Sequence, residues 1–165
     1  MNGRLLLCFE VFALLLFSGL ACAATSPSPQ VGVVLRVSDG DTIRVRVGNK
    51  EEKIRLYGID APETRQEGGA EAKNFLEDLL LSEQVTFYTL DVDRYGRQVA
   101  IVVLPNRKSV QDILLQQGLV WVYTKYCKVD RCKDWKRLEK QAQSARRGIW
   151  ATNPVPPWEW RVEYK

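Results

Sequence analysis

Apolar and polar residues first alternate with a period of two, in the runs 33–37, 43–47 and 53–59. This alternation is typical of strands that bury one face. The pairs Asp39-Gly40 and Gly48-Asn49, which favour tight turns, separate the runs. On the third run, Arg55 has the parity opposite to that of the apolar residues. The pattern therefore predicts a three-stranded antiparallel meander.

Helical spacing follows the meander. Apolar residues recur every three or four positions, and helices are predicted over the ranges 70–82, 110–117 and 134–147. Gly118 and Gly148 are expected just beyond helix ends, with Arg146 and Arg147 in a last turn. Two further alternating runs, 85–90 and 98–104, complete five strands. We expect a mainly β (α+β) fold, a five-stranded OB-fold barrel with three helices. Such a fold does not by itself specify a function.

The N-terminal segment differs from the rest of the chain. An apolar run over residues 11–20 follows Arg4, and Ala21-Cys22-Ala23 gives the small residues of a cleavage site. We predict a signal peptide at residues 1–23, because the run is too short to span a bilayer comfortably. Glu10 and Cys22 leave a membrane anchor and a lipoprotein open as alternatives. The expected location is secreted or periplasmic, with no stable membrane association after cleavage.

The rest of the 165-residue chain has a simple organisation. A polar linker (24–30) precedes one domain (31–152), and a tail rich in proline and tryptophan follows (153–165). The net charge of +4 suits a polyanionic partner, although it is weak evidence alone. No motif indicates an oligomer, so we expect a monomer.

Export would leave two cysteines in the mature chain, Cys127 and Cys132. In an oxidising compartment this pair predicts a local disulfide, with two free thiols as the alternative. A closed zinc site is disfavoured, because it needs four ligands and the chain contains no histidine.

The absence of histidine also restricts the chemistry. It excludes serine–histidine triads, cysteine–histidine dyads and histidine-bound zinc hydrolases. Hydrolysis of a phosphodiester would then rest on carboxylates, on arginines that hold phosphate, and on a hard cation bound by oxygen atoms.

Three short segments supply these groups: DGDT (39–42), RLYGIDAPET (55–64) and DRYGR (93–97). Each alone has an ordinary explanation, as a hairpin turn, a helix cap or a solvated polar turn. Their joint occurrence favours a catalytic group of residues.

The combination DGDT, RLYGIDAPE, DRYGR, QGLVWVY and GIW, in this order, resembles the staphylococcal (micrococcal) nuclease family over about residues 31–150. The resemblance implies a five-stranded OB-fold barrel with three helices. It also implies calcium-dependent hydrolysis of DNA and RNA to 3′-phosphate products, with little sequence specificity.

By this resemblance, Asp41 and Asp60 supply carboxylates to Ca²⁺, and Ala61 offers its backbone carbonyl. Glu63 matches the residue that contacts the attacking water, as general base or as an orienting group. Thr42 is placed near the metal's outer shell. Asp39 is expected to hold the turn.

Arg55 and Arg97 match the two arginines that clamp the phosphate. Four positions fall in segments that contact substrate in the family: Arg94, Tyr95, Tyr123 and Tyr126. We expect the substrate to be DNA or RNA that is single-stranded or locally melted, with salt-sensitive binding.

Two other classes of function compete with the nuclease. One is a non-catalytic nucleic-acid or protein-binding module, which the presence of all five acids and arginines disfavours. The other is an oligosaccharide- or peptide-binding OB domain, in which paired aspartates and arginines would have no common purpose.

The aromatic and basic residues outside these segments have simpler interpretations. Trp121 and Trp150 are expected in the core, and Trp158 and Trp160 are expected to pack the tail onto the barrel rather than to stack on bases. A basic cluster fits either a nucleic-acid rim or a solvated face: Lys125, Lys128, Arg131, Lys133, Lys136 and Arg137.

Overall fold

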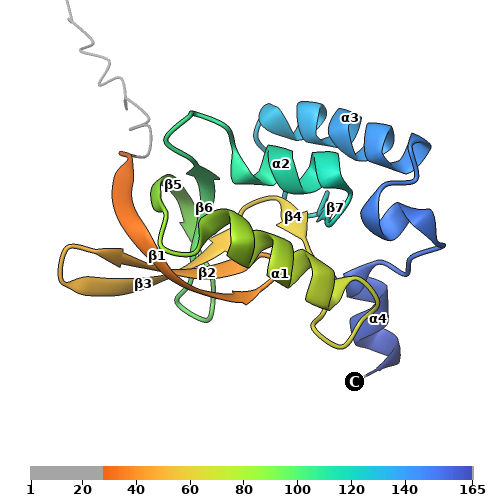
Figure 1. Cartoon of the computed structure of the whole chain (residues 1–165), viewed down its shortest axis with the longest axis horizontal. Coiled ribbons are helices and arrows are strands. Elements are labelled where there is room, and N and C mark those ends of the chain that lie inside the picture. The colour runs from red at the N-terminus through yellow and green to blue at the C-terminus, as the bar shows by residue number, and fades with distance from the viewer. Residues whose placement is uncertain (1–27, 165) are drawn as a thin grey trace, which may run out of the picture.

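Five strands close into a barrel with the order β1-β2-β3-β6-β5 (Figure 1). The computed structural model describes residues 28–164, so the predicted signal peptide lies outside the described residues. The strands are β1 (Gln30–Asp39), β2 (Thr42–Val47), β3 (Lys50–Leu56), β5 (Gln84–Val92) and β6 (Gln98–Val103). All neighbouring pairs are antiparallel except β3 with β6. The predicted OB-type barrel is confirmed.

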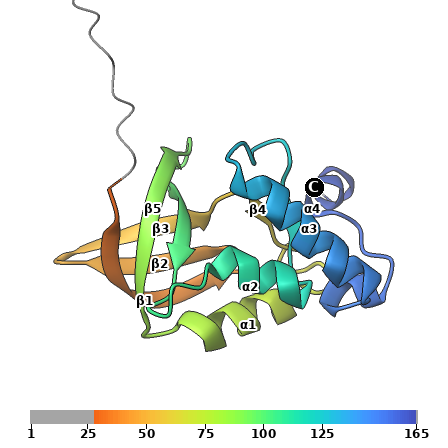
Figure 2. The same cartoon turned by 90° about the horizontal axis from the view of Figure 1, so that it is seen from above.

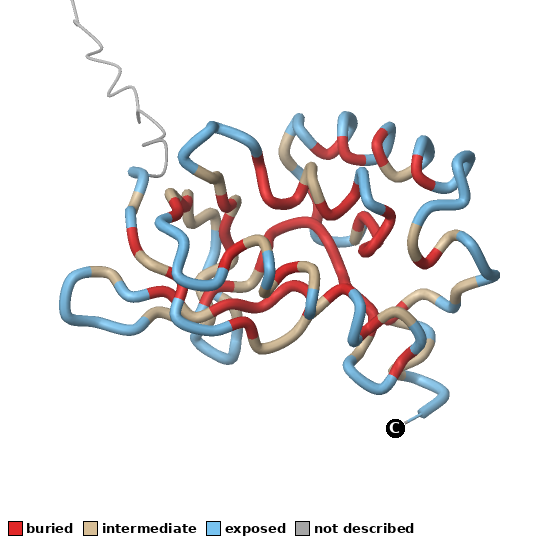
Figure 3. Tube along the Cα trace, in the orientation of Figure 1, coloured by how far each residue is buried: buried red, intermediate tan, exposed pale blue. Residues whose placement is uncertain are grey.

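Alternation places one face of each strand inside the barrel. Val34, Ile43, Ile54, Phe87 and Val102 are all at most 1% exposed. The intervening positions face outward, so the parity predicted for Arg55 puts it outside the barrel interior. In Figure 3, buried segments (red) and more exposed segments (tan and pale blue) follow one another along the strands.

The predicted third strand, 53–59, is not continuous. β3 ends at Leu56, and Gly58 adopts the left-handed conformation with φ 73°. The chain then forms β4 (Ile59–Asp60), which pairs with β7 (Trp121–Val122) instead of with the barrel. The chain turns at Gly58, in a conformation that glycine adopts more readily than other residues. As a result, Asp60 does not continue the register of β3.

Helices α1 (Gly69–Leu80), α2 (Val110–Gln117) and α3 (Arg131–Ser144) cover the barrel at one side and end (Figures 1 and 2). Ser109 caps α2 by accepting a hydrogen bond from the Asp112 N–H, and Gly118 ends the helix in the left-handed conformation. Leu76, Leu114 and Trp135 are fully buried and join the helices to the barrel core.

The predicted limits of the third helix, 134–147, were wrong at both ends. α3 begins at Arg131 and ends at Ser144, and Arg146 lies past the end with φ 49°. The Arg147 N–H bonds back to the Ala142 carbonyl, which closes the helix without a glycine at the left-handed position. Arg147 therefore serves a different helix, since its Nη1 donates to the Gln116 carbonyl of α2.

The C-terminal tail adds structure that the periodicity did not predict. After a short 3₁₀ helix, η1 (Gly148–Ala151), the chain forms α4 (Pro157–Glu163) with proline in its first turn. Figure 1 shows α4 beside the loop that leads into α1. Within residues 28–164, no helix is both long enough and apolar enough to cross a bilayer.

Candidate active site

Asp41 is fixed at the β1–β2 hairpin by several hydrogen bonds. Its N–H donates to Oδ1 of Asp39 at 3.1 Å, so Asp39 holds the turn as expected. The Asp41 carbonyl accepts from the Leu56 N–H at 2.8 Å, and its Oδ2 accepts from the Ala61 N–H at 2.8 Å. Thr42 donates its hydroxyl to Oδ1 at 3.2 Å. These contacts fasten the DGDT turn to the segment that carries Asp60.

The two segments also approach too closely for a side chain between them. A Cβ added at Gly40 would lie 2.7 Å from the Ala61 Cβ and 2.9 Å from the Ala72 Cβ of α1. Gly40 thus lets the hairpin contact both the Asp60 loop and the helix.

Arg55 brings the two aspartates together. Its Nη1 lies 2.7 Å from Oδ2 of Asp41, and its Nη2 lies 2.8 Å from Oδ1 of Asp60. The Asp60 side chain is only 2% exposed, because β4 sits between the barrel and β7. Oxygens from the two carboxylates therefore converge on one guanidinium group.

Glu63 follows Asp60 on a loop that is tightly folded. Its N–H donates to Oε1 of Gln66, and its carbonyl accepts from the Gln66 N–H at 2.8 Å. A Cβ at Gly69 would stand only 1.9 Å from the Glu63 carbonyl oxygen. The start of α1 thus fixes the backbone of Glu63, while its side chain stays 39% exposed.

Arg97 is held by the turn between β5 and β6. Asp93 accepts the N–H groups of Tyr95 and Arg97 on Oδ1, and it accepts Nε of Arg97 on Oδ2 at 2.6 Å. The Arg97 Nη1 then lies 3.5 Å from the Thr42 hydroxyl, next to Asp41. The structure thus brings together all five of Asp41, Arg55, Asp60, Glu63 and Arg97.

The electrostatics differ among these acids. Burial raises the pKa of Asp41 to about 7, against the opposing effect of Arg55. Burial also acts to raise the pKa of Asp93, but the hydrogen bonds from Arg97 and Tyr95 outweigh it and lower that pKa. Arg55 therefore offsets only part of the cost of burying the negative charge of Asp41, and a further cation beside that carboxylate would offset more of it.

The oxygen atoms fit a hard divalent cation. Asp41 and Asp60 offer carboxylates, the Ala61 backbone follows directly, and no sulfur or imidazole lies among them. In the described part of the chain, no group of three or more histidine, cysteine, aspartate or glutamate side chains is arranged to hold a metal. Two carboxylates and a carbonyl would leave further coordination positions to water and a phosphate oxygen, as such cations accept.

Arg161 of α4 enters the same cluster, and sequence reasoning missed it. Its Nη2 lies 2.6 Å from Oδ2 of Asp60, and its Nη1 lies 2.6 Å from Oε1 of Glu63. The available signal was Pro157, a favoured first residue of a helix, followed by Trp158 and Arg161 at a spacing of three.

The predicted substrate-binding residues divide into two groups. Tyr123 stacks on Trp158 with centroids 5.3 Å apart and planes 3° apart, and it meets Tyr126 edge-on at 4.9 Å. Arg94 and Tyr95 lie together at the tip of the β5–β6 turn, where Nη2 of Arg94 donates to the Tyr95 hydroxyl at 2.7 Å. Tyr95 is 68% exposed, and the guanidinium groups of Arg94 and Arg97 lie over its ring at 4.8 Å and 5.6 Å from the centroid.

The two remaining tryptophan predictions hold in part. Trp121 is 4% exposed and packs edge-on against Trp150, which is only half-buried. The tail does pack onto the molecule through Trp158, whereas Trp160 stacks on Tyr164 of the tail itself.

Three of the six residues of the basic cluster are paired with acids. Arg131 bonds to Asp112, Lys133 lies 3.6 Å from Asp130, and Arg137 lies 3.5 Å from Asp134. The last two pairs are open to solvent and leave their positive charges accessible to a polyanion.

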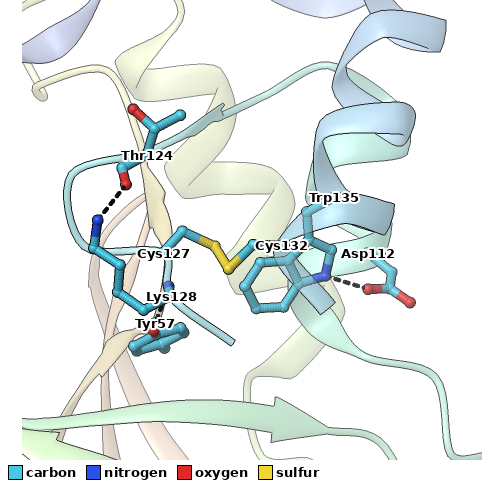
Figure 4. The surroundings of a disulfide bond; sticks show 7 residues. All are labelled: Tyr57, Asp112, Thr124, Cys127, Lys128, Cys132 and Trp135. Carbon is cyan, nitrogen blue, oxygen red and sulfur yellow. Dashed lines mark hydrogen bonds between the residues drawn. A yellow bond between two sulfur atoms is a disulfide. The ribbon is translucent and has the colours of Figure 1, made fainter. Parts of the chain in front are cut away.

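The predicted disulfide is present between Cys127 and Cys132 (Figure 4). The Lys128 N–H, inside this loop, donates to the Tyr57 hydroxyl at 2.8 Å. A Cβ on Gly58 would lie 2.8 Å from Sγ of Cys127 and 2.7 Å from the Trp135 ring. The disulfide loop therefore packs on the Tyr57-Gly58 turn, which separates Arg55 from Asp60.

Comparison with known proteins gives the family. The sequence model described as "Staphylococcal nuclease homologue" matches residues 53–152. The chain belongs to the staphylococcal nuclease family.

Relatives in this family carry related names. A protein of Escherichia coli O157:H7 named "Uncharacterized endonuclease" is 37% identical over 131 residues, which cover 79% of this chain and 84% of that protein. A "Micrococcal nuclease" of Shigella flexneri is 36% identical over 79% of each chain. A "Probable staphylococcal-like nuclease CAN1" of Oryza sativa subsp. japonica is 42% identical over 113 residues, 68% of this chain and 33% of that protein. With its family and its barrel, the chain is a nuclease of the phosphodiester-hydrolase class.

Proposed function

We propose that this staphylococcal nuclease homologue is an exported, calcium-dependent nuclease that cleaves DNA and RNA to 3′-phosphate products with little sequence specificity. The observation that carries the proposal is the convergence of Asp41 and Asp60 on Arg55, at 2.7 Å and 2.8 Å, beside Glu63 and Arg97. Carboxylates that hold a hard cation and arginines that hold phosphate are the two requirements of a phosphodiesterase without histidine.

Bound between these carboxylates, Ca²⁺ would polarise a phosphoryl oxygen and neutralise charge on the phosphate. Asp41, Asp60 and the Ala61 carbonyl would hold it. Hard oxygen ligands suit calcium, magnesium or manganese, and the choice of calcium follows from the resemblance to the family alone.

The arginines would bind the phosphate itself. Arg55 and Arg97 lie on either side of Asp41, and each presents nitrogen atoms that are partly buried, with side chains 14% and 22% exposed. Their charge would oppose the negative charge that grows on the phosphoryl oxygens during attack. Asp93 would orient Arg97 for this task through the Nε contact at 2.6 Å.

Glu63 would accept a proton from the attacking water or orient that water. Its side chain is the most exposed of the three acids, at 39%, and so it can reach solvent. Gln66 and Gly69 would fix the backbone from which it works.

Single-stranded or locally melted nucleic acid suits the surroundings. The aromatic rings of Tyr95 and Tyr126 are exposed, and Tyr123, beside Tyr126, is stacked on Trp158. Rings of this kind can stack on unpaired bases of any sequence. The net charge of +4 supports salt-sensitive binding of the backbone.

Export would proceed through the predicted signal at residues 1–23. The Cys127–Cys132 disulfide supports this part of the proposal, because disulfides persist mainly in secreted and periplasmic proteins. Mass spectrometry of the natural protein would give a mass without residues 1–23; an intact N-terminus would contradict export with cleavage, and an added lipid on Cys22 would indicate a lipoprotein.

Cleavage assays test the enzymatic part directly. Purified protein is incubated with single-stranded DNA, duplex DNA and RNA, in calcium and then in EDTA, and the product ends are mapped. We expect cleavage in calcium only, fastest on single strands, and a loss of at least about 100-fold in Glu63→Gln and in Arg97→Ala. Arg36→Ala, on the exposed part of β1, is the matched control and should retain full activity.

The outcomes separate the claims. Cleavage that persists in EDTA would refute the metal role but not the nuclease. A folded protein that binds oligonucleotides and cuts none of them in calcium would instead be a non-catalytic binding module.

A further inference from the structure

Helix α4 brings a positive charge onto two of the proposed catalytic acids. Arg161 donates to Oδ2 of Asp60 and to Oε1 of Glu63, both at 2.6 Å, from a position 98 residues beyond Glu63 in the chain. Because Arg55 already pairs with Oδ1 of Asp60, both oxygens of that carboxylate contact guanidinium groups. A divalent cation at Asp60 would therefore share both carboxylate oxygens with guanidinium groups or displace one of those groups.

The same helix covers an aromatic ring that is expected to contact nucleotides. Trp158 lies parallel to Tyr123, with an interplanar angle of 3° and a centroid distance of 5.3 Å. This is the geometry in which a nucleobase stacks on a tyrosine. Trp158 and Arg161 are three positions apart, so one face of α4 carries both groups into the site.

Ion pairs and one ring stack, rather than a buried apolar face, hold α4 to the molecule. It has seven residues, of which Pro157 alone is buried, and Val162 at its far end is 78% exposed. The segment before it is anchored by Gln66, whose Nε2 donates to the Val155 carbonyl at 2.6 Å. A helix of this length has little stability of its own, and no barrel core residue depends on it.

We propose that α4 is a displaceable plug of the active site, in which Arg161 competes with the metal ion for Asp60 and Glu63, and Trp158 competes with a nucleobase for Tyr123. The inference rests on the proposed function. A guanidinium group and a divalent cation repel each other, so each lowers the affinity of the same carboxylates for the other. Metal and nucleic acid together would therefore release the helix, and the tethered helix would lower the affinity for both.

Calcium affinity, measured by calorimetry on the full chain, is the first test. We expect Arg161→Gln to bind Ca²⁺ about tenfold more tightly than the unchanged protein. Val162→Ala, on the exposed face of the same helix, is the matched control and should leave the affinity unchanged.

Removal of the Arg161 charge would by itself raise the affinity for calcium, whether or not α4 is displaced. A second variant, which changes no charge, separates displacement of α4 from this charge effect. Trp158→Ala changes no charge but removes the stack on Tyr123 that helps to dock α4. The plug predicts that this variant also binds Ca²⁺ several-fold more tightly. An unchanged or weaker affinity in Trp158→Ala, or in Arg161→Gln, would overturn the proposal.

Hydrogen–deuterium exchange tests release of the helix without relying on activity. The probe is a short single-stranded oligonucleotide with phosphorothioate linkages, added in EDTA and in calcium. We expect residues 157–163 to lose protection on binding, while the barrel strands keep theirs. If the oligonucleotide binds and residues 157–163 stay protected, α4 is a fixed wall of the site and the plug is wrong.

The two proposals fail in different ways. A folded chain that cleaves nothing in calcium refutes the proposed function. A chain that cleaves in calcium, but whose Arg161→Gln and Trp158→Ala variants bind calcium as the unchanged protein does, refutes the plug alone.

Discussion

The backbone N–H of Ala61 donates a hydrogen bond to Oδ2 of Asp41 at 2.8 Å, across 20 positions of sequence. This bond ties the β1–β2 turn to the loop after β4, and both carry residues of the candidate site. A carboxylate that is only 6% exposed is thereby placed beside the backbone expected to share its metal.

Asp41→Asn should separate the catalytic role of this carboxylate from its structural role. The amide oxygen can still accept the Ala61 N–H, and a neutral group is easier to bury than a charged one. We expect stability to change by less than about 1 kcal/mol in urea unfolding, while cleavage in calcium falls by about 100-fold or more. A variant that keeps wild-type cleavage would exclude Asp41 from the metal site.

Asp93→Asn should weaken the positioning of Arg97. The carboxylate accepts two backbone N–H groups on Oδ1 and the Arg97 Nε on Oδ2. An amide that keeps the first two would present its NH2 group to the Arg97 Nε, and that contact would be lost. We expect cleavage to fall by about tenfold with a smaller change in KM. Asp91→Asn is the control, because Asp91 is exposed near the end of β5, beside this turn, and its side chain accepts a hydrogen bond from the Val92 N–H. Equal activities of the two variants would show that Asp93 does not position Arg97.

Asp93 also gives a pH dependence of stability. Burial acts to raise the pKa of Asp93, but the stronger combined effect of its hydrogen bonds lowers it below 3.8. A lowered pKa means that the unfolded chain binds the proton more readily, so this contribution is full near neutral pH and is lost as pH falls below about 4. Urea unfolding at pH 7 and pH 3.5 should show a stability difference between Asp93→Asn and the unchanged protein that shrinks at low pH. A difference that grows instead would contradict the assignment.

Glu139 of α3 predicts the opposite pH dependence. Burial raises its pKa, and its Oε1 accepts the Val122 N–H of β7 at 2.8 Å. A raised pKa means that the folded state holds the proton more tightly than the unfolded chain does. The contribution of Glu139 to stability is therefore full at low pH and is lost as pH rises through its folded-state pKa. Glu139→Gln keeps an acceptor for Val122 and should be more stable than the unchanged protein at pH 8 but not at pH 4. The exposed Glu71→Gln is the control for a general charge effect.

Removal of the disulfide should cost stability more than catalysis. Cys127 and Cys132 close a short loop, for which chain entropy alone predicts a loss of about 2 kcal/mol. The double serine variant should unfold at lower urea concentration and yet cleave at a similar rate at 25 °C, because the Tyr57–Lys128 bond can persist. If cleavage falls together with stability, the loop sets the geometry of Arg55 and Asp60 through the Tyr57-Gly58 turn.

Local pattern was enough to predict the barrel. Alternation along β2 and β5 agrees with the side chains that face inward. β1 departs from it, because its register shifts between Val34 and Arg36: Val34 and Val37 are buried, whereas Leu35 is 37% exposed. The break at Gly58 was not predicted, because Ile54, Leu56 and Ile59 are all apolar and buried. The change of parity between Leu56 and Ile59 was the available signal. The limits of α3 were missed for a similar reason, since Arg146 occupies a left-handed position that usually marks glycine.

The sequence alone determined which residues could do the chemistry. Without histidine, the acids and arginines of DGDT, RLYGIDAPE and DRYGR were the available groups, and their order indicated the family. Only the tertiary structure decided which of these groups contact one another, such as Arg55 with Asp41 and Asp60. It also decided that Arg161 of the tail pairs with Asp60. A contact across 98 positions depends on how a closed barrel and its helices pack, and no local period in the sequence carries that information.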